Sequence, residues 1–154
     1  MNYFPRLHCF GVWVLGDQLW SQQSALQSCL LPKQQTPVIF IESLTHAGQL
    51  PYHLQKLVLV WSAMRHFAAE LRSLGFPVTY AQSQDFNTPL LQWIEQYQIT
   101  ELRVMTPTDR PFAAWLNICE SQSPGWIYPL FPHPLDKSAI TLTSHEWIDT
   151  PLAE

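Results

Sequence analysis

Apolar residues in this chain fall into short continuous runs, which are separated by stretches with helical periodicity. The runs at 9–15, 37–42, 77–81, 101–105 and 126–130 predict strands of a parallel sheet, because such strands are covered on both faces. Helices are predicted between them, around Gln22 to Leu30 and at 51–74, 88–98 and 111–120. The alternation predicts an α/β fold in which a doubly wound, Rossmann-like sheet of five parallel strands is flanked by helices.

The stretch 51–74 carries the clearest helical pattern. Pro51 lies near its start, where a missing backbone donor does no harm, and Gly75 stands where the C-terminal cap belongs. Apolar residues recur along one face at three- and four-residue steps, namely Leu57, Val60, Met64, Phe67, Leu71 and Leu74.

The length of 154 residues corresponds to about one domain, and no internal repeat or interdomain linker is apparent. From about Pro132 the pattern thins, and residues 142–147 are typical of a short terminal element on a surface. We therefore predict one α/β domain over residues 1–135 and a C-terminal tail or linker over residues 136–154.

Composition narrows the classes of function. Only 13% of the residues are charged, whereas 47% are apolar and seven are Trp, which indicates a thick core or an apolar surface covered by a partner. The formal net charge of -4 argues against autonomous nucleic-acid binding, which needs a basic face. We therefore expect no direct binding to nucleic acid.

The three cysteines, Cys9, Cys29 and Cys119, are widely spaced and form neither a disulfide framework nor a CxxC pair. This usage is typical of the reducing cytoplasm, where we expect the protein to reside. The apolar run at 9–15 is too short to span a membrane and lacks a signal-peptide cleavage site, so no membrane association is expected.

Ligands of open parallel sheets bind beyond the carboxyl ends of the strands. Asp17 at such an end is interpreted either as a ligand-binding residue or as a residue that caps its own turn, and Gly16 as a glycine that serves the turn. Trp20 and Trp61 are the tryptophans that we expect to line a pocket or an interface. The candidate segments are Gly16 to Gln18 after the first strand, Glu42 to His46 after the second and Thr106 to Arg110 after the fourth.

Sequence motifs for several common classes of binding site and active site are absent from the chain. The five glycines form neither a GxGxxG dinucleotide turn nor a GxxxxGK phosphate loop, and no GxSxG nucleophile elbow is present. The six histidines never take the HExxH arrangement or another zinc-binding spacing. We therefore predict neither catalytic nor metal-binding residues.

Four segments together resemble a known family. They are residues 15–19 (LGDQL), the strand ending in Glu42, His53-x-x-Lys56 and residues 62–71 (SAMRHFAAEL). In sequence and spacing they resemble the N-terminal domain of deoxyribodipyrimidine photolyase-related proteins, the bacterial iron–sulfur cryptochrome/photolyase group. The resemblance covers essentially the whole chain.

The resemblance implies that two domains of the family carry out separate functions. In this family the N-terminal α/β domain holds a light-harvesting antenna chromophore, in the best-known case 6,7-dimethyl-8-ribityllumazine. A larger helical domain holds FAD and an iron–sulfur cluster, and it repairs DNA lesions with light. This chain corresponds to the first domain alone, and its three cysteines do not supply that cluster. We therefore expect an antenna-type module of a lyase family, without FAD, an iron–sulfur cluster or enzymatic activity of its own.

The resemblance also implies a set of chromophore-binding residues. His46 stands where the lumazine-binding pattern has a carboxylate, and Gln49 where it has a Tyr, so the identity of the chromophore is open while the pocket is expected. The loss of one buried acceptor from a ligand contact costs on the order of 1–3 kcal/mol. The implied residues are Gly16, Asp17, Gln18, Glu42, His46, Gln49, His53 and Val60.

Three hypotheses follow. In the first, the chain binds a lumazine-like chromophore and docks onto a separate FAD-binding chain. In the second, it has lost the chromophore and is only an interaction module for such a partner, or a homodimer in isolation. In the third, it is an independent enzyme or nucleotide-binding protein in which Asp17 and His46 act as an acid/base pair.

Overall fold

The computed structural model describes residues 9–49, 51–108, 110, 112–114 and 127–130, the last four by their backbone alone. The strands are β1 (Phe10–Trp13), β2 (Val38–Ser43), β3 (Val78–Ser83), β4 (Glu101–Met105) and β5 (Ile127–Leu130). The helices are α1 (Ser24–Gln27), α2 (Leu44–Gly48), α3 (Leu54–Ser73) and α4 (Asn87–Tyr97), and a 3-10 turn spans Lys33–Gln35.

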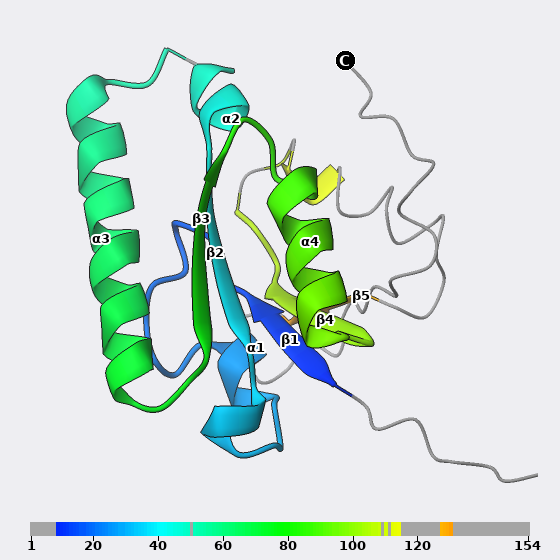
Figure 1. The fold of residues 1–154 in the computed structure, drawn as a ribbon. Helices are drawn as coiled ribbons and strands as arrows, with labels where there is room; N and C mark the ends of the chain where they lie inside the picture. Colours follow the sequence, from blue (N-terminus) through cyan, green and yellow to red (C-terminus); the bar gives the residue numbers. More distant parts are fainter. Residues whose placement is uncertain (1–8, 50, 109, 111, 115–126, 131–154) are drawn as a thin grey trace, which may run out of the picture.

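The strands form a parallel sheet in the order β3-β2-β1-β4-β5. The chain runs outward from β1 to β2 and β3, and then crosses back to place β4 on the other side of β1 (Figure 1). The predicted α/β fold with a parallel sheet between helices is confirmed. The reversal of direction beside β1 separates the loops after β1 and β4, and such a point is where ligands of these sheets bind.

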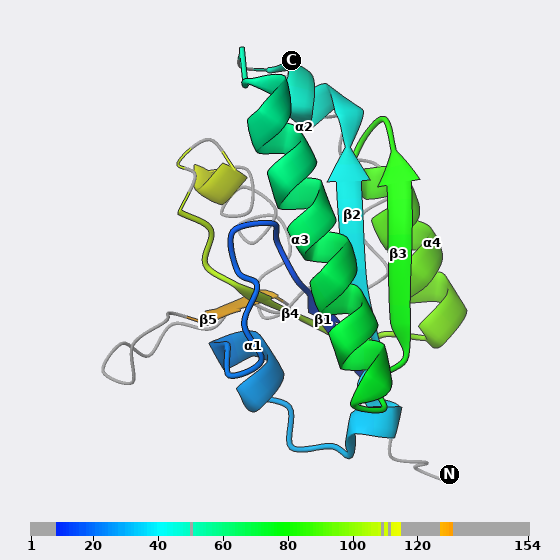
Figure 2. The ribbon, with the colours of Figure 1, turned by 90° about the vertical axis from the view of Figure 1, so that its left-hand side faces the viewer.

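Helices cover both faces of the sheet, with α3 on one side of β2 and β3 and α4 on the other (Figures 1 and 2). Alternate residues of β1 therefore belong to different hydrophobic cores. Val12 lies in the core beneath α3, and Trp13 lies in the core beneath α4. The core beneath α3 includes Met64, Phe67 and Leu71 of the predicted apolar face, and the neighbouring Ala68. Helix α1 adds Ala25 and Leu26 to the same core. The α4 core includes Leu90, Trp93 and Ile94.

Two glycines are required by the packing of these layers. A Cβ at Gly11 would lie 2.5 Å from Trp93 Cη2, so glycine in β1 allows α4 to approach the sheet closely. Gly75 has a φ of 96° and follows the last turn of α3, and its N–H donates to Arg72 O over 3.0 Å. The predicted end of the long helix at this glycine is therefore confirmed.

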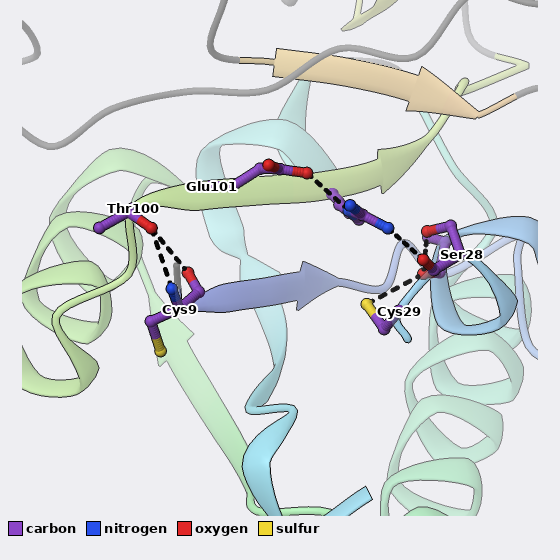
Figure 3. Close-up of polar contacts among 7 residues, drawn as sticks. Cys9, Ser28, Cys29, Thr100 and Glu101 are labelled. Carbon is purple, nitrogen blue, oxygen red and sulfur yellow. Dashed lines mark hydrogen bonds and ion pairs between the residues drawn. The ribbon is translucent and has the colours of Figure 1, made fainter. Parts of the chain in front are cut away.

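The amino ends of β1 and β4 are joined by side chains (Figure 3). The Cys9 N–H donates to Thr100 Oγ1 over 3.0 Å, and the guanidinium of Arg103 pairs with Glu101 over 2.7 Å and donates to Ser28 O at the end of α1. Cys9 and Cys29 are free thiols, and burial raises the pKa of both. The contact between Cys9 and Thr100 thus joins the starts of the two strands, while Arg103 holds the end of α1 against the middle of β4.

The structure differs from the predicted elements mainly in short segments and in bounds, as in α1, which is shorter than the helix predicted around Gln22 to Leu30, and in the 3-10 turn, which was not predicted. Leu44–Gly48 forms the one-turn helix α2, which was not predicted, and the Ser43 side chain caps it by accepting from the His46 N–H over 3.2 Å. The long helix begins at Leu54 and not at Pro51. Residues 110 and 112–114 are helical, whereas 115–120, the terminal element at 142–147 and the tail at 136–154 lie outside the described residues.

No helix in the described part of the chain combines the length and the apolar character that crossing a membrane requires.

Candidate functional site

A cavity of about 360 Å³ lies over the carboxyl ends of β1, β2 and β4. Its walls come from the loops after β1 and β4, from the end of β2 with α2, and from the first half of α3. Its volume lies in the range that holds a small organic ligand. Residues from all three candidate segments, those after β1, β2 and β4, line this cavity.

Helix α3 supplies the apolar wall of the cavity through Leu57, Val60, Trp61 and Met64. A Cβ on Gly16 would lie 2.9 Å from Val60 Cγ1 and 3.2 Å from Met64 Sδ, so the loop after β1 touches this wall. The prediction that Gly16 serves a turn is confirmed, because Gly16 and Asp17 lie at the centre of a turn that the Gln18 N–H closes by donating to Leu15 O over 3.0 Å. That turn needs no left-handed φ at Gly16, since Gly75 is the only described glycine with one. Gly16 is required because of the close contact with α3.

Aromatic rings form a second wall. Phe86 and Phe112 line the cavity with their ring centroids 5.3 Å apart, and His46 lies 5.3 Å from Phe86 and 5.9 Å from Phe112. Trp13 packs edge-on against both phenylalanines, at 5.5 Å from each. Rings held at these angles and distances form a rigid surface suited to a flat apolar ligand.

The polar part of the lining is small. Thr108 Oγ1 after β4 donates to Asp17 Oδ2 after β1 over 2.5 Å, which joins the two sides of the crevice. Ser43 Oγ donates to Gln84 O over 3.0 Å and accepts from the His46 N–H, so backbone groups occupy this hydroxyl. It is thus not paired with a base in the way that a nucleophile requires. The arrangement suits binding better than group transfer.

The sequence interpretation did not assign Tyr52, Lys56, Phe86 or Phe112 to the site, although all four line the cavity. Tyr52 precedes α3 and Lys56 lies in its first turn, and the Lys56 amine lies 4.9 Å from the centroid of the Tyr52 ring. Lys56 was part of the motif that carries the family resemblance, but it was not assigned to the site. The spacing of Tyr52 and Lys56 by one helical turn was the available signal.

Glu42 has a different environment from the one expected for a ligand contact. Its side chain is only 4% exposed, and it accepts two hydrogen bonds from the Arg65 guanidinium over 2.9 and 3.0 Å. The Tyr80 hydroxyl and the Gln82 amide also donate to it, the latter over 3.0 Å. Glu42 is not part of the cavity lining. Its hydrogen bonds instead join β2 to α3 and β3.

These donors determine the charge of Glu42. Burial favours the neutral acid, but the hydrogen bonds from Arg65, Tyr80 and Gln82 outweigh burial and lower the pKa of Glu42 below its ordinary value. Burial together with the Glu42 carboxylate raises the pKa of Tyr80, which therefore remains a hydroxyl donor. Glu42 is therefore an ionised, buried group whose charge is held by polar donors from α3 and β3.

The structure brings together half of the residues that the resemblance implies. Gly16, Asp17, His46 and Val60 line the cavity. Gln18 is buried beside it, where its amide donates to Met105 O over 2.8 Å and to Thr106 O over 3.2 Å. Gln49 follows α2 and His53 precedes α3, and both residues are exposed and outside the lining. Glu42 is also outside the lining, but it is buried. Of the two suspected tryptophans, Trp61 lines the cavity, while Trp20 is not part of the lining.

Metal chemistry finds no support in the part of the chain that the structure describes, because no three His, Cys, Asp or Glu side chains gather there. Of the described residues that line the cavity, only Asp17 and Lys56 are formally charged at neutral pH, with His46 as a further titratable group. A single lysine offers few of the charged donors that a diphosphate requires, so the lining does not resemble a diphosphate site.

Comparison with known proteins agrees with this geometry. Residues 12–129 match the model of the family described as deoxyribodipyrimidine photo-lyase-related protein. The chain is also similar to a (6-4) photolyase of Agrobacterium fabrum (strain C58 / ATCC 33970), with 38% identity over 74 residues. That match covers 48% of this chain and 14% of the photolyase. Because the family match extends over more than half of the sequence, the chain belongs to the deoxyribodipyrimidine photolyase-related proteins.

Proposed function

We propose that the cavity binds a light-harvesting chromophore of the ribityl-lumazine type and that the chain serves a separate FAD-binding photolyase-type chain. The observation that carries this proposal is the cavity itself, which lies at the strand ends where the sheet reverses direction and is open to a ligand. Family membership supplies the chemical class. When bound, such a chromophore supplies the absorption of light.

The lining matches the two parts of such a ligand. A flat ring fits between the apolar α3 wall, with Val60 and Trp61, and the aromatic wall of Phe86 and Phe112. The hydroxyl groups of a ribityl chain find an acceptor in the Asp17 carboxylate, beside the hydroxyl of Thr108. Transfer of excitation energy requires only proximity and orientation, so a site without a catalytic arrangement suffices.

The first test is an absorption spectrum of the purified protein, with mass spectrometry of the compound that acid releases. A stoichiometric lumazine is the expected result. Protein that is isolated empty is then titrated with 6,7-dimethyl-8-ribityllumazine, and binding is followed by ligand fluorescence. Absence of binding in this titration would overturn the proposal.

Filling part of the cavity is expected to weaken binding of the ligand. In Val60→Trp, the larger side chain occupies the space against the α3 wall, and we expect the Kd for ribityl-lumazine to rise at least about tenfold, equivalent to about 1.4 kcal/mol. The matched control is Val58→Trp, since Val58 lies on the same helix but is 56% exposed and outside the lining. Equal Kd values for the two variants would place the ligand elsewhere.

The interaction module without a chromophore is the second candidate, because α3 exposes apolar side chains at Leu54, Val58 and Leu59. His46 and Gln49 depart from the lumazine-binding pattern, which also favours it. This candidate gains support if the protein stays empty in the titration but forms a stable complex with an FAD-binding photolyase-type chain in analytical ultracentrifugation. A homodimer in isolation would appear in the same experiment without the partner.

A further inference from the structure

The start of α3 places positive charge at one end of the cavity. The Lys56 amine is held against the Tyr52 ring, 4.9 Å from its centroid, and both residues line the cavity. Tyr52 thus restrains a side chain that would otherwise move freely in solvent. A lining residue at the start of α3 thus holds this amine beside the cavity.

The backbone of α3 adds to this charge. The helix has 20 residues, no acidic residue in its first turn and no side-chain hydrogen bond from its N-cap residue His53. The N-terminus of a long helix carries a partial positive charge, which acidic residues or a capping oxygen would otherwise offset. Lys56 and the helix dipole therefore act in the same direction.

The remaining titratable groups that face the cavity come from other elements. Asp17 follows β1 and accepts the Thr108 hydroxyl, His46 belongs to α2, and Tyr52 precedes α3. The negative charge thus lies at the crevice between β1 and β4, whereas the positive charge lies at the start of α3. A ligand with a polyol at one end and an acidic ring at the other matches this polarity.

We propose that Lys56 favours the anionic form of a lumazine-type ring bound in the cavity, which rests on the proposed function. The ring loses one proton to solvent, and its negative charge spreads over carbonyl oxygens that the Lys56 ammonium attracts. An opposite charge within about 4–6 Å shifts a pKa by about one unit or more. The bound ring is therefore expected to ionise at a pH about one unit below that of the free ring, a roughly tenfold change in its acid dissociation constant.

The test compares the pH titration of the absorption spectrum of 6,7-dimethyl-8-ribityllumazine when free and when bound. Lys56→Met is expected to remove most of the shift, and Lys56→Arg to keep it. The matched control is Lys33→Met, because the Lys33 amine also lies over a ring, 5.8 Å from the centroid of Phe76, but Lys33 is not part of the cavity lining. His46→Gln tests the other group that can become cationic, and this variant is expected to keep the shift.

The outcomes separate this inference from the proposed function. Absence of binding at a pH where the ring is neutral overturns both. Binding with an unchanged pKa of the ring, or a shift that survives in Lys56→Met, overturns the role of Lys56 and leaves chromophore binding intact. Loss of the shift in His46→Gln alone would assign it to the imidazole and likewise overturn the role of Lys56.

Discussion

Replacement of Trp13 by alanine is expected to lower the free energy of unfolding by about 3–5 kcal/mol, the range for removal of a large buried aromatic residue. Trp13 is fully buried in β1 and packs edge-on against Phe86 and Phe112. Both phenylalanines line the cavity, so the lost volume would loosen the aromatic wall as well as the core. Urea unfolding followed by far-UV circular dichroism measures the change.

Trp20→Ala is the matched control, because it also removes one tryptophan but from a side chain that is 42% exposed. We expect this variant to lose less than about 1 kcal/mol. If Trp13→Ala does not fold, Trp13→Phe retains a ring in the aromatic cluster and is expected to show an intermediate loss. A loss in Trp13→Ala no larger than that in Trp20→Ala would contradict the assignment of Trp13 to the core.

Glu42→Gln is expected to destabilise the protein at neutral pH by on the order of 1–3 kcal/mol, since hydrogen bonds to a buried charged group are lost or weakened. The pKa of Glu42 is lower in the folded protein than its ordinary value of 4.5, so the folded state binds the proton less tightly than the unfolded state. The stabilisation is therefore fully present above about pH 4.5 and is lost as the pH falls through the lowered value. The difference between wild type and variant should shrink on acidification.

The measurement is urea unfolding of both proteins at a series of pH values from 7 to 3. Because other carboxylates also titrate in this range, the quantity of interest is the difference in free energy of unfolding between the two proteins. Glu70→Gln, which removes an exposed carboxylate from α3, is expected to follow the wild type at every pH. A difference in free energy of unfolding between wild type and Glu42→Gln that stays constant down to pH 3 would refute the claim that ionised Glu42 stabilises the fold.

The fold could be predicted from the sequence because its signals are local. The strand predicted at 101–105 is β4 with the same bounds, and the long helix is α3 with a later start. The early start was predicted because Pro51 is acceptable in a first helical turn, whereas the structure places the N-cap at His53. Helix α2 has five residues, too few for helical periodicity to appear, and only its cap Ser43 marked it.

The site could be predicted only in part, because its geometry depends on residues far apart in the chain. The end of each strand could be located, and so Asp17 and Thr108 were both in candidate segments. The role of Glu42 depends on Arg65, Tyr80 and Gln82, which lie 23 to 40 positions away, and no spacing pattern connects them. The resemblance therefore assigned Glu42 to a ligand, whereas in the structure its side chain is fully engaged within the protein.

The cavity takes its walls from segments that extend from Leu15 to Phe112, and three strands must be paired before those walls face one another. The unfolded chain has no such surface, so a ligand of this cavity binds only the folded state. Its binding free energy is then added to the stability of the fold, by about 2.7 kcal/mol at a free ligand concentration one hundred times the Kd. A larger supply of ligand would therefore raise the fraction of chains that are folded at any moment.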